Sequence, residues 1–236
     1  MDSLTHITLG ACVGELMLGK QLGKKALLWG ALSQCLPDID TFAAVLYPAD
    51  QAFLIHRGIT HSVLFAVAIG LILGLAAKKI HRKTRVAFSL LAFFFCFQLL
   101  LHDLLDTCNS YGTGLLEPFS HQRFSINLLY VADPFFTTSL LLAAVFLVFK
   151  NVNNKNRPKW ALFAICVSAF YLVIAGINKT YIDHRAEASF QSQKITPSNY
   201  FSTPAPFNCM LWYIVAEADS SYCTGNDIPK IGRAHV

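Results

Sequence analysis

Apolar residues gather in six segments along the chain, separated by short polar connections. These segments are residues 4–19, 26–36, 59–77, 86–106, 131–149 and 160–177. The last four are each about 18 to 21 residues long, enough for a helix rising about 1.5 Å per residue to cross roughly 30 Å of hydrocarbon. The pattern therefore predicts four full membrane spans preceded by two short helices.

The two short N-terminal segments are compatible with two arrangements. They could form a helical hairpin that enters the bilayer only partly, or a closely packed pair in which small residues let the two helices approach. The glycines available for such a contact are Gly10, Gly14, Gly19, Gly23 and Gly30. The first twenty residues lack a basic start and a small-residue cleavage site, so we do not expect a removable signal peptide.

The chain becomes polar and mixed in composition after the last apolar segment. Residues 181–193 predict a short helix that leaves the membrane. Residues 200–224 carry Pro, Phe, Trp and Tyr in short alternating runs, which are typical of strands. We therefore expect a small extramembrane α+β region at this end of the chain.

These patterns divide the chain into three parts. Residues 1–178 form a transmembrane helical domain, and residues 179–230 form an outer-side C-terminal region. Residues 231–236, IGRAHV, resemble the translation of a sequencing adapter, so we exclude them from the fold and expect the native C-terminus to be missing. The predicted fold class is all-α: a polytopic membrane helical bundle with a small, truncated extramembrane segment.

Composition supports a membrane protein. Of the 236 residues, 54% are hydrophobic and only 14% are charged, and the mean hydropathy is positive. An ordinary soluble domain of this size is less apolar. The net charge of +5 requires no nucleic acid, because basic loops at anionic lipid headgroups account for most of the basic residues.

Lysine and arginine concentrate in three connections between the apolar segments. These connections are residues 20–25, 78–85 and 150–159. By the positive-inside rule all three are cytoplasmic. An alternating path through the segments then places the remaining connections on the outer side: His6, residues 37–61, residues 102–130 and everything after residue 178.

Three ionisable side chains lie where the fourth apolar segment ends, in the sequence HDLLDTCNSYGT. They are His102, Asp103 and Asp106, and each charged residue in hydrocarbon would cost about 2.5 to 3.5 kcal/mol. On a helix, His102 and Asp106 face the same way and Asp103 can share their edge. This set suits a divalent ion such as zinc, manganese or iron. The simpler alternative is a pair of residues that caps a membrane helix.

Two further candidate groups precede this stretch. His6 lies in the opening sequence MDSLTH, and Asp38 and Asp40 lie in PDID. Proline ends the preceding helix, and in an extended segment residues two apart point to the same side, so we expect the two carboxylates to lie together. The alternatives are a surface histidine and an ordinary helix stop.

The fourth group is HRGITHS, which contains His56, Arg57 and His61. Gly58 permits a turn, and Thr60 is expected to cap the helix that follows. Alone, this stretch could be a polar helix cap. Four separate segments, however, deliver His or Asp to the same predicted membrane face, which favours one shared metal site. The predicted metal ligands are His6, Asp38, His56, His61, His102 and Asp106.

The same motifs resemble the YdjM-like family of inner-membrane metal-dependent hydrolases. The resemblance covers residues 1 to about 226 and includes MDSLTH, PDID, HRGITHS, HDLLDTCNSYGT, ADPFFT and PAPFNCMLW. It implies a multi-pass protein of the cell inner membrane. The family's grouping with zinc-dependent phospholipase C type enzymes implies hydrolysis of a phosphate ester, such as a phospholipid. This chain departs from the pattern at Asp103, where a small or apolar residue is expected, and at Cys209, where proline is expected.

For a hydrolase, the expected cofactor is a divalent metal, zinc in the first place, with manganese and iron as alternatives. Six candidate ligands exceed the three protein ligands of a tetrahedral catalytic site, so a two-metal site stays open. Arg57 could pair with a substrate phosphate, and Asp40 or Asp103 could act as general base or orient a ligating histidine.

Two other functions fit the same residues. A metal-binding transporter or channel would also place ionisable residues in membrane segments, and a membrane protein could hold a purely structural metal. A transport path should have ligands at several depths, whereas the candidates in this sequence gather at one end of the spans. We therefore expect a membrane-bound hydrolase with its site at the outer face.

Overall fold

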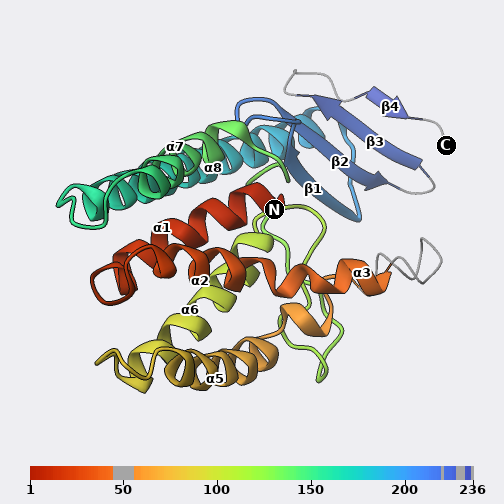
Figure 1. The fold of residues 1–236 in the computed structure, drawn as a ribbon. Helices are drawn as coiled ribbons and strands as arrows, with labels where there is room; N and C mark the ends of the chain where they lie inside the picture. Colours follow the sequence, from red (N-terminus) through yellow and green to blue (C-terminus); the bar gives the residue numbers. More distant parts are fainter. Residues whose placement is uncertain (45–55, 219–220, 227–231, 235–236) are drawn as a thin grey trace.

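The structure is a computed structural model, and it describes residues 1–44, 56–218, 221–226 and 232–234. Within these ranges, six longer helices form three antiparallel hairpins that lie side by side, and a small sheet follows at the C-terminal end (Figure 1). The hairpins are α1 (Ser3–Leu22) with α2 (Lys24–Cys35), α5 (Val63–Ile80) with α6 (Phe88–Asp106), and α7 (Pro134–Phe149) with α8 (Arg157–Gln193).

The turns within the three hairpins lie at the same end of the bundle, at the left in Figure 1. These turns carry the three basic connections that the sequence singled out. The opposite end holds the N-terminus, the short helices η1 (Pro37–Ile39), α3 (Asp40–Ala44) and η2 (Ile59–His61), and the connection from α6 to α7. The predicted separation of basic turns from candidate ligands is therefore present in the fold.

Among the described residues, three helices are long and apolar enough to cross a membrane, namely α5, α6 and part of α8. The fourth predicted span, residues 131–149, is a helix of only 16 residues. It starts at Pro134 because the Asp133 side chain accepts hydrogen bonds from the backbone N–H groups of Phe135 and Phe136, an N-cap followed by proline. The prediction of four full spans is therefore not confirmed.

The first two helices form a hairpin and are also a closely packed pair, so the predicted close contact through small residues is present. A Cβ added at Gly30 would overlap the carbonyl oxygen of Gly10, and one at Gly14 would overlap that of Ala26. Only glycine lets the two backbones come this close. α1 also packs against α7 and α8, so it lies inside the bundle.

A buried ion pair fixes the end of α1 that is distant from the candidate ligands. The Arg157 guanidinium at the start of α8 donates to both carboxylate oxygens of Glu15, at 2.9 and 2.6 Å. Both side chains are nearly inaccessible to solvent, and Arg157 also donates to the Leu147 and Lys150 carbonyl oxygens. Two parallel charge-assisted hydrogen bonds hold α1 in a defined register against α8.

The C-terminal region differs in part from the prediction. α8 continues without a break to Gln193, so the expected separate helix over residues 181–193 is instead the outer part of this helix. An antiparallel sheet follows in the order β1 (Asn199–Pro204), β2 (Trp212–Ala218), β3 (Ser221–Asn226) and β4 (Gly232–Ala234). β4 lies within the residues that we excluded from the fold. The sheet packs on α8 through an apolar cluster: Ile182, Ala186, Phe190, Trp212, Ile214 and Ala216.

Candidate metal centre

The last turn of α6 supplies two of the candidate ligands from one helix face. His102 and Asp106 are four residues apart, and His102 Nε2 lies 3.9 Å from Asp106 Oδ2. Both side chains are fully buried. This arrangement is the one expected from helical spacing.

Asp38 reaches the site from a turn that the sequence did not predict. Pro37 starts the 3₁₀ helix η1 directly after α2, because proline is tolerated in the first turn of a helix. The backbone is therefore helical rather than extended, and Asp38 and Asp40 do not point to the same side. Asp38 faces His61 and His102, whereas Asp40 lies behind His61.

His61 comes from η2, which precedes α5. The cap of α5 is Ser62, whose side chain accepts from the Phe65 backbone N–H, so the prediction of Thr60 as the cap is wrong. Thr60 instead donates to Asp40 Oδ2. The helix starts two residues later than predicted, and this leaves His61 on the short turn that points into the site.

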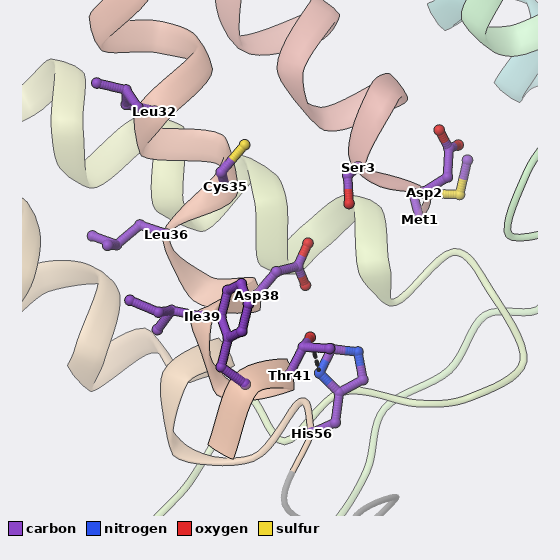
Figure 2. Close-up of a pocket in the computed structure, with 11 residues that line it drawn as sticks. Met1, Asp2, Ser3, Leu32, Cys35, Leu36, Asp38, Ile39, Thr41 and His56 are labelled. Carbon is purple, nitrogen blue, oxygen red and sulfur yellow. Dashed lines mark hydrogen bonds between the residues drawn. The ribbon is translucent and has the colours of Figure 1, made fainter. Parts of the chain in front are cut away.

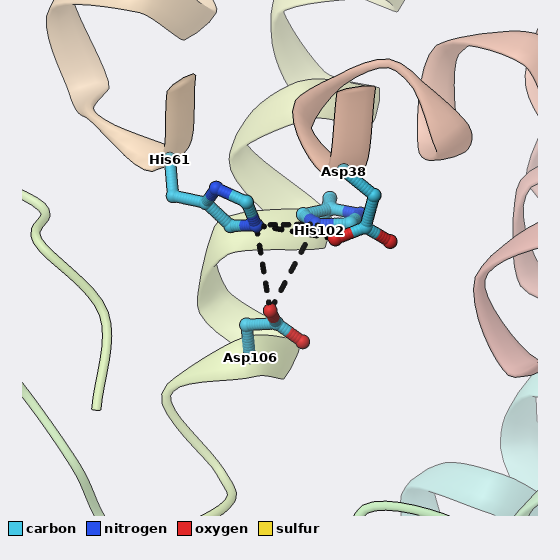
Figure 3. A group of neighbouring side chains, drawn as sticks. All are labelled: Asp38, His61, His102 and Asp106. Carbon is cyan, nitrogen blue, oxygen red and sulfur yellow. Dashed lines mark hydrogen bonds and ion pairs between the residues drawn. The ribbon is translucent and has the colours of Figure 1, made fainter. Parts of the chain in front are cut away.

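Four ligand atoms converge between these elements (Figure 3). They belong to Asp38, His61, His102 and Asp106, and all lie within 4.8 Å of one another. His61 Nε2 is 3.4 Å from Asp38 Oδ1 and 3.6 Å from Asp106 Oδ2, and His102 Nε2 is 3.7 Å from Asp38 Oδ1. The ligands of a tetrahedral zinc ion lie about 3.3 Å apart, so the spacing is close to that of a metal site.

The hydrogen-bond partners of the two histidines at Nδ1 leave both Nε2 atoms facing the other ligand atoms. The Nδ1–H of His102 donates to the Gln34 carbonyl oxygen at 2.7 Å, which leaves a lone pair on Nε2. His61 Nδ1 lies 3.1 Å from the Thr60 hydroxyl, whose proton is donated to Asp40, so His61 Nε2 also carries a lone pair. The two Nε2 atoms and two carboxylate oxygens would repel one another without a positive charge, which either a proton on His61 Nε2 or a bound cation supplies.

The carboxylates around His61 also favour a positive charge at this place. Burial lowers the pKa of His61, but hydrogen bonds to Asp38 and Asp40 and the charge of Asp106 outweigh burial and raise it to about 9. The surroundings thus favour positive charge at this place. A divalent ion would take the place of the proton, because metal-ligating histidine is neutral.

Asp40 holds His61 from outside the group of four. Its carboxylate accepts from the backbone N–H of Arg57 at 3.0 Å and from the Thr60 hydroxyl at 2.5 Å, and it lies 2.7 Å from His56 Nδ1. Burial raises the pKa of Asp40, but the hydrogen bonds from His56, His61 and Thr60 outweigh it and lower the pKa. Asp40 therefore stays anionic and can orient a ligating histidine. His56, which the sequence predicted as a metal ligand, contacts Asp40 and does not belong to the group of four.

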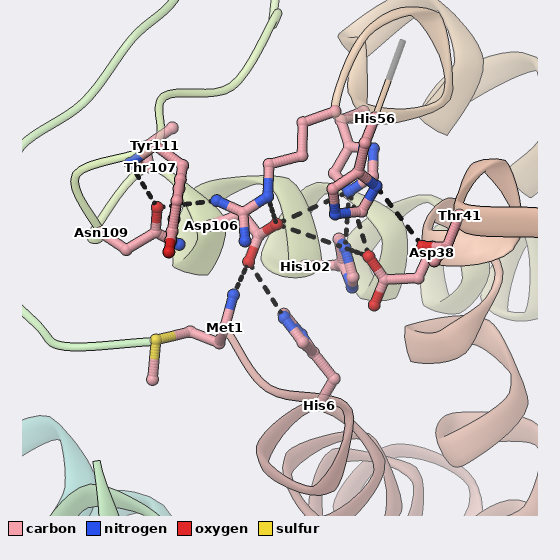
Figure 4. A network of polar contacts seen from close by, with 12 residues as sticks. Met1, His6, Asp38, Thr41, His56, His102, Asp106, Thr107, Asn109 and Tyr111 are labelled. Carbon is pink, nitrogen blue, oxygen red and sulfur yellow. Dashed lines mark hydrogen bonds and ion pairs between the residues drawn. The ribbon is translucent and has the colours of Figure 1, made fainter. Parts of the chain in front are cut away.

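His6 lies beside the group without belonging to it. Its ring stacks on His102 with 3.8 Å between centroids, and its Nε2 is 3.1 Å from Asp106 Oδ1. The amino group of Met1 contacts the same oxygen. Figure 4 shows His6, Met1 and Asn109 around Asp106. His6 therefore faces the carboxylate oxygen that the group of four does not use.

Gln34 is a positioning residue that the sequence reasoning missed. Its side-chain oxygen faces His6 Nδ1 at 3.0 Å, and its amide donates to the Gln98 carbonyl oxygen at 2.8 Å. Its backbone carbonyl accepts from His102. The signal in the sequence was an amide side chain within the apolar segment 26–36.

Arg57 and Asp103 lie next to the centre. Arg57 Nε is 3.2 Å from Asp106 Oδ2, and Arg57 adopts a left-handed backbone with φ of 65°, a conformation that costs a non-glycine residue about 1 to 3 kcal/mol. Asp103 is buried, and no described residue donates a hydrogen bond to either of its carboxylate oxygens. A buried carboxyl group that receives no hydrogen bond is costly in its charged form.

A pocket of about 540 Å³ opens from the centre toward apolar surface (Figure 2). Its polar lining consists of Asp2, Ser3, Asp38, Thr41 and His56. Its apolar lining consists of Leu32, Leu36, Ile39 and Phe42, and the Ile39 and Phe42 side chains are exposed on the outside of the bundle. The pocket therefore connects a candidate ligand with a surface suited to hydrocarbon.

The fold and centre together define an α-helical membrane protein with a buried histidine and aspartate cluster. Comparison with known sequences agrees. The chain belongs to the YdjM inner membrane protein family, whose model matches residues 1–182. This match confirms the family part of the resemblance over these residues, which contain the complete group of four.

Two curated relatives share part of the chain. Inner membrane protein YbcI of Escherichia coli (strain K12) is 31% identical over 123 residues, which cover 51% of this chain and 69% of that protein. Uncharacterized protein YfhP of Bacillus subtilis (strain 168) is 32% identical over 157 residues, 61% of this chain and 45% of that protein. The matched region thus spans less than half of the Bacillus protein. No solved structure matches the chain.

Proposed function

We propose that the protein is a membrane-bound, metal-dependent hydrolase of phosphate esters such as phospholipids. The observation that carries the proposal is the convergence of two imidazole nitrogens and two carboxylate oxygens from η1, η2 and α6. Nitrogen and oxygen donors in this combination suit zinc, with manganese and iron as alternatives. A divalent ion held there would polarise a phosphoryl oxygen and make water reactive at neutral pH.

The chain's own residues then have defined tasks. Asp40 holds the His61 ring in position through Nδ1, and the Gln34 carbonyl does the same for His102. Arg57 lies 3.2 Å from Asp106 Oδ2 and can pair with a substrate phosphate through its planar guanidinium. Asp103, a buried carboxylate near the group, is the candidate general base.

The apolar pocket supports a lipid as the substrate. Its polar lining includes Asp38, a member of the group of four, and Leu32, Leu36, Ile39 and Phe42 contribute an apolar part of the wall. An amphiphile could therefore place its phosphate at the centre and its acyl chain against these side chains. A water-soluble phosphate ester has no acyl chain that could pack against these apolar side chains.

The proposed orientation places the centre on the outer, periplasmic side of the inner membrane. The turns of the three hairpins carry the basic connections and lie at the end opposite to the centre. Basic loops remain in the cytoplasm. This orientation gives the centre access to lipids of the outer leaflet.

A metal-binding transporter is the alternative from another class, and it requires ligands at more than one depth. The buried ionisable groups at the far end of α1 are Glu15 and Arg157, and they bind each other through two hydrogen bonds. This pairing leaves Glu15 unsuited to receive a cation that has passed the centre. A purely structural metal is the third possibility, and it differs from the hydrolase in having no substrate.

The test is hydrolysis by the purified full chain in detergent, measured with phospholipid and with a soluble phosphodiester. We expect activity that a chelator removes and zinc restores, and that His61→Gln abolishes. The matched control is His121→Gln, because His121 is exposed and pairs with Glu117 away from the centre. Tight metal binding without hydrolysis of any phosphate ester would contradict the proposal and favour transport or a structural metal.

A further inference from the structure

A second cavity adjoins the metal centre on the side of the α6–α7 connection. Its volume is about 270 Å³, and its lining consists of Met1, His56, Arg57, Tyr111, Arg123 and Val131. It shares Met1 and His56 with the apolar pocket. The two pockets therefore meet beside the centre, one with an apolar wall of leucine, isoleucine and phenylalanine and the other containing two arginines.

Arg57 connects the centre to this cavity. Its Nε faces Asp106 at 3.2 Å, and its Nη1 donates to Asn109 Oδ1 at 2.7 Å. The guanidinium also lies over the Tyr111 ring, 5.3 Å from the centroid. The position of Arg57 is fixed at the backbone as well, because Asp40 accepts from its N–H and Gly114 donates to its carbonyl.

Arg123 is brought to the same cavity by a short antiparallel bridge. Thr113 and Phe124 exchange two backbone hydrogen bonds, at 2.9 and 3.0 Å. Gly112 has a φ of 77°, and a Cβ there would lie 3.0 Å from the Cβ of Arg123. The guanidinium donates from Nη2 to the His56 carbonyl oxygen at 3.2 Å. The loop is therefore built to hold this side chain beside the centre.

Two guanidinium groups in one small cavity repel each other. Burial and the charge of Arg57 lower the pKa of Arg123, while Glu117 and Asp40 raise it. The net shift is downward, so the two carboxylates do not fully offset burial and the neighbouring arginine. An anion between the guanidinium groups would offset the remaining repulsion.

We propose that the cavity between Arg57 and Arg123 is a binding site for a phosphate group, and that Arg123 determines the preference for substrates carrying that group. The planar fork of each arginine can donate two hydrogen bonds to phosphate oxygens. The phosphate of a lipid would enter this cavity while its acyl chain occupies the apolar pocket. As a statement about substrate, this inference rests on the proposed function, but binding of the anion requires no hydrolysis.

The first experiment measures binding of inorganic phosphate to the purified full chain, depleted of metal with a chelator and then dialysed. Calorimetric titration should show that Arg123→Gln weakens binding by at least roughly tenfold, and that Arg123→Lys restores part of it. Arg82→Gln is the matched control, because Arg82 is exposed in the α5–α6 turn at the other end of the bundle. Thermal unfolding of each variant checks that the fold is retained.

The second arm separates free phosphate from a lipid headgroup. Mixed micelles containing phosphatidic acid are compared with micelles containing diacylglycerol of the same acyl chains, which lacks the phosphate. A loss of preference for phosphatidic acid in Arg123→Gln supports the site, whether or not free phosphate binds measurably. Equal binding of both phosphate and phosphatidic acid by Arg123→Gln and the wild type would overturn it.

The two proposals fail in different ways. If phosphate binding depends on Arg123 but no ester is hydrolysed, the anion site stands and the hydrolase proposal fails. If a phospholipid is hydrolysed with the same KM by the wild type and by Arg123→Gln, the hydrolase proposal stands and the role of Arg123 fails.

Discussion

The Nε2 atoms of His61 and His102 lie 3.2 Å apart, although each ring turns its other nitrogen toward an oxygen of the protein. His102 is held by a backbone carbonyl of α2, and His61 is held by Thr60 and Asp40. When both rings are neutral, neither can donate to the other, whereas the raised pKa of His61 places a proton on its Nε2 when no metal is bound. A cation bound by both nitrogens would take the place of that proton.

Asp40→Asn tests the orienting role of the carboxylate behind His61. The variant should bind metal roughly 10- to 100-fold more weakly while retaining the fold, because loss of such a partner loosens the ligand without removing it. Competition with a chromogenic chelator measures the affinity. Asp183→Asn, in the outer part of α8, is the control and should bind like the wild type. Unchanged affinity in Asp40→Asn would show that His61 needs no partner at Nδ1.

Cysteine labelling tests the orientation. In intact cells, an impermeant thiol reagent should label His121→Cys, which lies in the exposed α6–α7 connection. The same reagent should not reach Arg82→Cys or Lys155→Cys, which lie in basic turns at the opposite end. The native cysteines are first replaced, and permeabilised cells give the full signal for each position. Labelling of the basic turns in intact cells would move the centre to the cytoplasmic side.

Glu15→Gln tests the ion pair that fixes α1. Removing one partner of a buried pair leaves the other charge uncompensated and typically costs about 3 to 5 kcal/mol. Arg157 keeps its bonds to the Leu147 and Lys150 carbonyls, so we expect the lower end of this range. Denaturant unfolding in detergent measures the free energy, with Glu187→Gln on exposed α8 surface as the control. A change below about 1 kcal/mol would show that the pair contributes little.

Leu36→Trp tests the apolar pocket as the acyl-chain site. The larger side chain should fill space in the pocket and raise the KM for a long-chain phospholipid several-fold. Hydrolysis of a short, soluble phosphodiester should stay unchanged, because the centre itself is not altered. Leu71→Trp, on the exposed face of α5, is the matched control. An equal effect on both substrates would mean that the substitution disturbs the centre and that the pocket does not distinguish lipids.

Sequence patterning identified the helices and most of the centre because each depends on local chemistry. Long apolar runs predict helices, and His102 and Asp106 share a face through helical spacing alone. The convergence of Asp38 and His61 on these residues followed from their position at one end of the spans. Three of the four segments proposed to carry ligands therefore contribute to the group of four.

The errors came from local turns as well as from contacts between distant segments. The helix before Pro37 ends as predicted, but Pro37 starts a turn of 3₁₀ helix where an extended segment was expected, so the two carboxylates of PDID separate. α7 begins after the cap at Asp133, so the apolar segment 131–149 that was counted as a full span contains a helix of 16 residues. The amide of Gln34 in an apolar segment did not show which residues it contacts, and Arg123 gave no local signal of its role, because both roles depend on neighbours from distant segments.

The most direct test of the central claim is the metal content of Asp106→Asn. The substitution keeps the size of the side chain but replaces an anionic ligand with a neutral amide, which binds a divalent cation far less well. Asp133→Asn is the matched control, because Asp133 is also buried at the outer end and caps a helix, a task that asparagine performs equally well. The proteins are purified in parallel, loaded with zinc, dialysed and compared by elemental analysis. We predict bound zinc in the wild type and in Asp133→Asn and its loss from a folded Asp106→Asn, whereas equal zinc in all three proteins, or none in the wild type, would contradict the metal centre.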